Sequence, residues 1–408
     1  MTGACALPAG TAAPRPAAWG GVMAMALCVF ALIASEFMPI SLLTPIAADL
    51  HISEGVAGQG LSISGAFAVL MSLSISALSG KLNRKTLLLG LTAAMCVSGA
   101  VIALAQGVFT YMIGRALIGV VVGGFWSLTA ATAMRLVPAH QVPRALAIFN
   151  AGNALATIVA APLGSYLGSI VGWRGTFFCL VPVALAAFAW QSISLPAMHV
   201  EATASSSRGV LRLLGQQPVR LGMLAVGTFF MGQFMLFTYL RPFLETVTQL
   251  EVGTLSLILL TIGVAGFVGT SVIGKVLARG LFGTLIAIPL GMAAIGGGLI
   301  AFGGRAEAVT VLLAAWGLLA TAAPVGWWSW IARTLPQDAE VGGGLMVAVI
   351  QLAIALGATL GGVLFDASGY RSTFAASTGL LLAAAWLAHR TGRAAARMEQ
   401  RCTRCAEV

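Results

Sequence analysis

A single carboxylate, that of Glu36, lies deep inside the first long apolar stretch of this chain. The stretch from Gly20 to Ile46 is otherwise almost uncharged, and it is long enough to cross a lipid bilayer. An ionisable group is costly to bury in lipid, so it generally has both a partner and a function. Because a carboxyl group can gain and lose a proton, Glu36 is the leading candidate for a proton-handling residue.

Arg115 is the natural partner for Glu36, because it lies within another apolar stretch, in the segment Gly114–Gly119. The long arginine side chain can close much of the gap between the two helices. A deprotonated Glu36 compensates the charge of a buried Arg115, and protonation of the carboxylate releases the pair. The alternative is a permanent ion pair with a purely structural role.

Several aromatic and amide side chains also fall inside the apolar stretches. Aromatic rings that stack and amides that form hydrogen bonds together suit a flat polar solute such as a nucleobase. For each single residue the alternative is packing, or a place in an aromatic belt at the membrane surface. The candidates for substrate binding are Trp126, Asn150, Asn153, Gln233, Tyr239, Trp316, Trp327 and Gln351.

The composition predicts an all-α membrane protein. Of 408 residues, 59% are hydrophobic and only 8% are charged, whereas soluble domains carry roughly 25% charged residues. Apolar blocks of membrane-spanning length recur along the chain. They predict twelve transmembrane helices at roughly 20–46, 57–79, 86–106, 110–132, 145–168, 175–195, 219–244, 253–275, 282–302, 307–332, 342–365 and 372–390.

The net charge of +10 reflects membrane topology. Most of the 22 lysines and arginines fall in segments on the side of the two chain termini. By the positive-inside rule, both termini are then cytoplasmic. The same distribution argues against a nucleic-acid partner.

The two halves of the sequence resemble each other at an offset of 197 or 198 residues. Glu36-Phe37-Met38 corresponds to Gln233-Phe234-Met235, and Gly172-Trp173-Arg174 corresponds to Gly369-Tyr370-Arg371. An even number of helices in each half makes the repeats parallel. The predicted organisation is a disordered N-terminus (1–19), a six-helix bundle (20–195), a linker (196–218), a second six-helix bundle (219–390) and a basic tail (391–408). Since Gln233 cannot titrate, the proton is expected in the first half.

Long motifs in the chain resemble the purine ribonucleoside efflux pumps of the drug:proton antiporter branch of the major facilitator superfamily. They include residues 36–45, 52–59, 123–126, 134–138, 237–242, 324–327 and 347–352. The resemblance implies export of purine nucleosides, such as inosine, guanosine and their analogues, in exchange for protons. It also implies that the first, fourth, seventh and tenth helices line a central cavity.

The loop at 80–85 is similar to the gating loop of that superfamily, with Gly80, Asn83 and Arg84 in the motif positions. Asn83 stands where the family has an aspartate, so an ordinary positively charged loop is an equal alternative. No enzyme motif is present, and no metal, cofactor or obligate protein partner is expected, because the energy source is the proton gradient. The competing interpretations are the same fold exporting sugars or drugs and, more remotely, a membrane sensor or enzyme.

Overall fold

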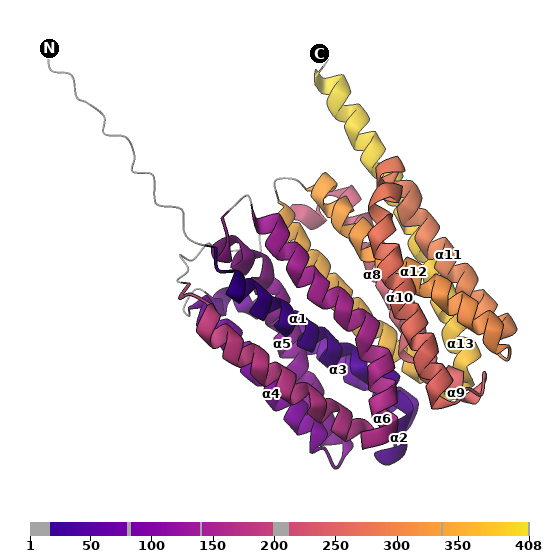
Figure 1. Ribbon diagram of the computed structural model, residues 1–408. Coiled ribbons are helices and arrows are strands. Elements are labelled where there is room, and N and C mark those ends of the chain that lie inside the picture. Colours follow the sequence, from indigo (N-terminus) through magenta and orange to yellow (C-terminus); the bar gives the residue numbers. More distant parts are fainter. Residues whose placement is uncertain (1–16, 80–82, 139–140, 199–211, 336–337, 407–408) are drawn as a thin grey trace, which may run out of the picture.

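The computed structural model describes residues 17–79, 83–138, 141–198, 212–335 and 338–406, and within these ranges it is built from helices (Figure 1). The helices are α1 (Trp19–Ser41), α2 (Leu43–Asp49), α3 (Glu54–Ser79), α4 (Arg84–Ala103), α5 (Val108–Leu136), α6 (Val142–Ser194), α8 (Gln217–Thr238), α9 (Leu240–Thr246), α10 (Val252–Arg279), α11 (Leu281–Phe302), α12 (Ala306–Thr334) and α13 (Ala339–Ala406).

The described residues contain ten helices long and apolar enough to cross a membrane. Two of them, α6 and α13, each contain one residue with non-helical backbone angles, Gly172 and Gly369. Their φ values of 72° and 75° are accessible to glycine at little cost. Each of these helices therefore consists of two spans, and the expected set of twelve is confirmed. The predicted bounds leave residues 169–174 and 366–371 between spans, whereas in the structure the helices continue through both segments and are interrupted only at the glycine.

The first and seventh predicted helices are shorter than the sequence suggests, because each breaks before a proline. α1 ends at Ser41 and α8 ends at Thr238, and each is followed by a separate seven-residue helix. Pro45 and Pro242 lack a backbone N–H and so leave the carbonyl four residues earlier without its helical donor. In the opposite direction, the last helix continues beyond the predicted end at 390, through Ala406, in a segment rich in alanine and arginine, which favour helix.

The sequence repeat is also a structural repeat. The short helices α2 and α9 occupy equivalent positions, and so do the glycines at the two kinks. His51 and Gln249, which are 198 positions apart, are the two non-glycine residues of the described chain with positive φ, at 54° and 58°. This shared backbone strain at equivalent positions indicates two copies of one six-helix unit. We call α1–α6 the first half and α8–α13 the second half.

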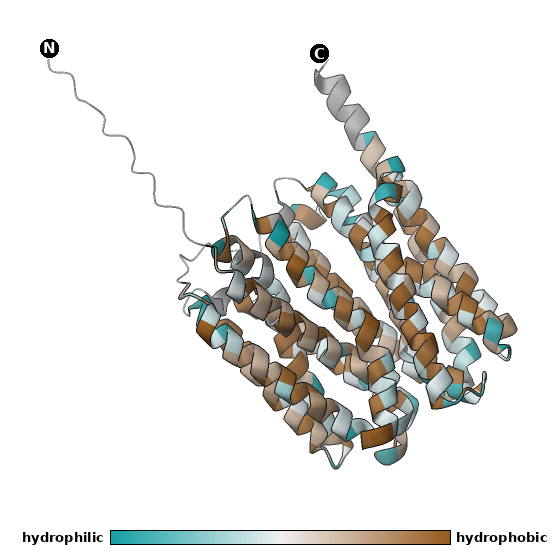
Figure 2. Cartoon of the chain, in the orientation of Figure 1, coloured by the Kyte–Doolittle hydropathy of each residue, from teal (hydrophilic) through white to brown (hydrophobic). Residues whose placement is uncertain are grey.

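The halves pack together mainly through α3 against α13 and α6 against α10. In Figure 1, α2 and α9 lie at one end of the molecule, opposite the end at which α1 begins, and we call this the α2/α9 end. Hydrophobic residues run along the helices and hydrophilic ones gather towards their ends (Figure 2). Large apolar side chains such as Leu73, Phe109 and Ile193 are exposed, as expected where helices face lipid.

The predicted boundaries between bundles, linker and tail stay predictions. Residues 1–16, most of the linker (199–211) and residues 407–408 lie outside the described part of the chain. Gly80, proposed for the gating loop, lies outside it as well.

Candidate functional site

Glu36 lies where the two halves meet, and its side chain is buried, with 6% of the residue exposed. Its nearest polar partner comes from the other half: Gln351 Nε2, on α13, donates a hydrogen bond to Glu36 Oε1 over 3.3 Å. Gln351 is itself buried. The one carboxylate in the apolar part of α1 is therefore tied directly to the second half of the molecule.

Arg115, on α5, is fully buried but does not pair with the Glu36 carboxylate. Its guanidinium donates to three backbone carbonyls, those of Ser35 (2.8 Å), Glu36 (3.0 Å) and Gly60 (3.2 Å). Among the described residues no ion pair joins Glu36 and Arg115, so the expected direct pair is not formed in this state.

The reason lies in Pro39, which sits inside α1. A proline has no N–H to offer the carbonyl four residues earlier, here that of Ser35. A buried carbonyl without a donor is costly, and the forked guanidinium of Arg115 supplies one. Arg115 thus holds the backbone of α1 at Glu36 and leaves the carboxylate free for Gln351.

A polar atom without a partner lies at the equivalent position of the second half. Gln233, on α8, has a buried amide oxygen with no hydrogen-bond partner among the described residues. Beside it, Phe234 stacks on Phe37 of α1, with ring centroids 5.6 Å apart and planes 24° apart. An acceptor beside aromatic rings is the kind of group that suits a flat solute with N–H or O–H donors.

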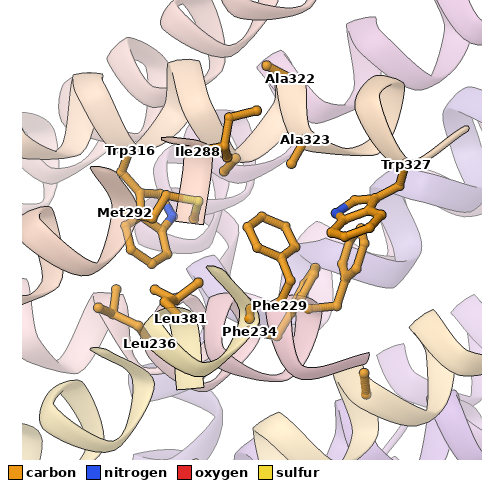
Figure 3. Packing of buried hydrophobic residues seen from close by; sticks show 14 of the residues in the cluster. Phe229, Phe234, Leu236, Ile288, Met292, Trp316, Ala322, Ala323, Trp327 and Leu381 are labelled. Atoms are coloured by element: carbon orange, nitrogen blue, oxygen red, sulfur yellow. The ribbon is translucent and has the colours of Figure 1, made fainter. Parts of the chain in front are cut away.

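Trp316 and Trp327 do not belong to this group. Both are almost fully buried in the apolar core around α8, α11 and α12. Figure 3 shows Trp316 beside Met292 and Trp327 near Phe229. Trp327 also packs edge-on against Trp330, with centroids 5.9 Å apart. Their place in the structure is that of packing residues of the second half.

Tyr239 lies away from Glu36, at the break between α8 and α9. It is fully buried, its hydroxyl donates to the carbonyl of Ala358 over 2.7 Å, and its ring stacks on Phe365 with centroids 5.2 Å apart. With its hydroxyl and its ring occupied in this way, Tyr239 holds the α2/α9 end together.

The remaining candidates are dispersed over the first half. Trp126 and Asn153 are half-buried, whereas Asn150 is exposed and its amide donates to the carbonyl of Leu146 on its own helix over 3.1 Å. Asn83 caps α4, since its side-chain oxygen accepts from the backbone N–H groups of Lys85 and, across the loop, Met198. Within the described part of the chain, none of these residues forms a hydrogen bond or ion pair with Glu36.

The backbone of Arg84 donates to the carbonyl of Met198 over 3.1 Å, so this loop is tied to the end of α6. A cavity of about 560 Å³ lies between α10, α11 and α12, with an almost wholly apolar lining that includes none of the candidate residues. Glu36, Gln351 and Gln233 are not part of that lining.

Sequence reasoning missed two residues that join the halves at the α2/α9 end, Arg241 and Asp366. Arg241 donates to the carbonyl of Ser41, and Asp366 accepts from Ser53 and Gly55. The signal for the first was Pro45, which frees the Ser41 carbonyl. Nothing in the local sequence around Asp366 indicates its partners, which lie more than 300 positions away.

Comparisons with known proteins agree with this architecture. The Major Facilitator Superfamily matches residues 25–342. A protein of Pseudomonas aeruginosa named transcription regulatory protein OpdE is 63% identical over 93% of this chain and 95% of its own length. The purine ribonucleoside efflux pump NepI of Salmonella paratyphi B is 39% identical, over 89% of this chain and 91% of its own length.

Two solved structures show the same fold at low sequence identity. The nucleoside transporter NupG (D323A mutant) superposes with a TM-score of 0.74 at 11% identity, covering 91% of this chain and 98% of its own. A bacterial homologue of the lysosomal transporter Spinster, in an inward-facing and unoccupied conformation, gives 0.70 at 16% identity, covering 93% and 98%.

Proposed function

The chain belongs to the major facilitator superfamily, and we propose that it exports purine ribonucleosides across the bacterial inner membrane in exchange for protons. The observation that carries this proposal is the buried carboxylate of Glu36, which a hydrogen bond to Gln351 ties to the opposite half. Support for the cargo comes from the 39% identity to a purine ribonucleoside efflux pump. Membership of this superfamily implies a transporter of small molecules, not an enzyme.

The hydrogen bond between Glu36 and Gln351 suggests how the proton and the solute exclude each other. A charged carboxylate accepts a hydrogen bond about twice as strongly as a neutral acceptor. Deprotonated Glu36 therefore holds Gln351, or, in its place, a hydroxyl or N–H donor of the nucleoside. Protonation weakens this bond and favours release of the solute. Since Gln233 cannot take up a proton, it serves as a constant hydrogen-bonding group for the base.

In the proposed cycle, the state described here faces the cytoplasm, with the α2/α9 end on the outer side. Glu36 releases its proton to the cytoplasm and the nucleoside binds. The halves then rock so that the solute leaves outside, where Glu36 is protonated again. The positive-inside distribution of lysine and arginine supports this orientation.

The test is uptake of labelled inosine into inverted membrane vesicles under an imposed pH gradient, acid inside. We expect accumulation that collapses when a protonophore removes the gradient. Excess guanosine should compete, whereas excess xylose or a lipophilic cation should not. Competition by the sugar or the cation, and none by guanosine, would assign the chain to the same fold with another cargo.

A second candidate, control of gene expression, is favoured by the name of the 63% identical relative. A transporter can alter transcription by changing the internal concentration of an inducer. A reporter strain that carries either the wild-type chain or a transport-deficient Glu36→Gln variant separates the two. Loss of regulation together with transport indicates an indirect effect, and regulation by the transport-deficient chain indicates a direct one.

A further inference from the structure

Two oppositely charged side chains of the second half reach across the interface to two helix ends of the first half. The first is Arg241 on α9, which is buried, with 6% of the residue exposed. Its Nη1 donates to the carbonyl of Ser41, the last residue of α1, and its Nε donates to Glu245 over 2.7 Å. Because the C-terminal end of a helix carries partial negative charge, a cation is favourable there.

The sequence of α1 and α2 creates the need for this contact. Ser41 lies four residues before Pro45, so its carbonyl has lost the helical donor that another residue at 45 would supply. In the interior of a membrane protein water does not readily replace that donor. Arg241 supplies it from the other half, and Ser165 Oγ on α6 lies 3.4 Å from the same guanidinium nitrogen.

The second charged side chain is Asp366 on α13. Its two oxygens accept from the hydroxyl of Ser53 (2.5 Å) and from the backbone N–H of Gly55 (3.0 Å). These groups form the start of α3, where the Ser53 hydroxyl also accepts from the N–H of Val56 over 3.1 Å. Because the N-terminal end of a helix carries partial positive charge, an anion is favourable there.

We call Arg241 at the end of α1 and Asp366 at the start of α3 the two charged caps. Between them the halves are in close contact. A Cβ on Gly58 of α3 would collide with the hydroxyl of Tyr239, and one on Gly362 of α13 would lie about 3.0 Å from the backbone of Gly55. Further along α3, Ser62 donates to the carbonyl of Ala355 over 2.9 Å. The α2/α9 end is therefore closed, with both charged caps at its margin.

The equivalent positions of the first half do not carry these charges. At an offset of 197, Arg241 corresponds to Thr44 and Asp366 corresponds to Ser169. Neither counterpart is charged, and the Ser169 hydroxyl donates to the carbonyl of Tyr166 on its own helix over 2.7 Å. At these equivalent positions of the described chain, the charged groups therefore come from the second half.

We propose that Arg241 and Asp366 together hold the α2/α9 end closed. The change to the state that is open at this end then requires both contacts to break, that of Arg241 with the end of α1 and that of Asp366 with the start of α3. The two residues position the halves and touch no solute. Hydrogen bonds to charged groups contribute enough that losing one shifts a two-state ratio about tenfold or more towards the open state.

The test measures distances by pulsed electron paramagnetic resonance between spin labels at Ala48 and Ala306. These small exposed residues lie in different halves at the α2/α9 end. The labels are placed in a variant that lacks the other cysteines. We compare wild type, Asp366→Asn, Arg241→Gln and Ser53→Ala. The matched control is Asp49→Asn, which breaks an ion pair with Arg174 at the same end but within the first half.

We expect a larger long-distance population in Asp366→Asn, Arg241→Gln and Ser53→Ala, and a wild-type distribution in Asp49→Asn. Ser53→Ala retains every charged group, so it reports on the Asp366 cap even if the charge-removing variants fail to fold. Wild-type distributions in Ser53→Ala and in every folded variant of Asp366 and Arg241 overturn the proposal, as does an equal shift in Asp49→Asn. The measurement uses no solute, so its result is separate from the identity of the cargo.

Discussion

Phe37 and Phe234 occupy equivalent positions in the two halves and stack on each other with their ring centroids 5.6 Å apart. In a protein built from two parallel repeats, residues near the pseudo-twofold axis meet their own counterparts. This stack therefore marks the axis. The residues just before it, Glu36 and Gln233, flank the axis with a titratable carboxyl group in the first half and a neutral amide in the second.

The hydrogen bonds of Arg115 predict a dependence on Pro39. Arg115→Gln leaves the Ser35 carbonyl without a donor and should destabilise the protein by about 1–3 kcal/mol. Pro39→Ala restores a helical N–H for that carbonyl, so Arg115→Gln should cost less in the Pro39→Ala background. Thermal unfolding in detergent of both single variants and the double variant measures this coupling.

The control for that cycle is Pro162→Ala, which changes a proline inside another helix of the first half. Its effect should add to that of Arg115→Gln within about 0.5 kcal/mol. If the stability changes of Arg115→Gln and Pro39→Ala were also strictly additive, the Ser35 carbonyl would not be the reason why Arg115 stabilises the protein.

The unpaired amide oxygen of Gln233 predicts a change in affinity without a loss of stability. Gln233→Leu should weaken inosine binding by roughly 1–3 kcal/mol, because a donor of the solute loses its acceptor. Thermal stability should stay the same or rise, since the unsatisfied atom is removed. Calorimetric titration on purified protein gives the dissociation constant, and Asn150→Ala, at an exposed amide, serves as the control. Equal affinities in the two variants would remove Gln233 from the site.

The burial of Trp316 predicts the reverse, a loss of stability without a loss of affinity. Trp316→Phe should lower stability by about 1–3 kcal/mol through lost core packing and leave the dissociation constant for inosine unchanged. The matched variant Trp328→Phe changes an indole that is 45% exposed and should shift stability by less than about 0.5 kcal/mol. A large loss of inosine affinity in Trp316→Phe would return this residue to the substrate site.

The sequence predicted the fold well because its signals are local. Apolar blocks reveal membrane spans, and a repeat at a fixed offset reveals two like halves. It predicts the helix breaks poorly, since a proline inside an apolar stretch can either kink a helix or end it, and α1 and α8 end before Pro45 and Pro242. The repeat aligns Gly172 with Gly369, but the break in the helix at each glycine depends on backbone angles that the sequence does not give.

The candidate site was predicted only in part. Glu36, Gln233 and Gln351 could be selected as polar groups in apolar helices, and the structure brings Gln351 to Glu36. Sequence does not give the direction of a side chain, so for Trp316 and Trp327 it leaves substrate contact and packing as alternatives, and in the structure both indoles lie in the apolar core. For Arg115 the sequence indicates an opposite charge as partner, because sequence alone does not show that the Ser35 carbonyl, freed by Pro39, lies within reach of the guanidinium.

The exchange of a proton on Glu36 for the solute is tested most directly by measuring the release of protons when inosine binds. Purified protein in weakly buffered detergent solution, equilibrated at a pH where the site is protonated, is mixed with inosine while a pH indicator is followed. We expect proton release by the wild type and by Asp49→Asn, and none by a Glu36→Gln variant that still binds inosine. Undiminished release by Glu36→Gln would contradict the assignment of Glu36 as the group that exchanges its proton for the solute.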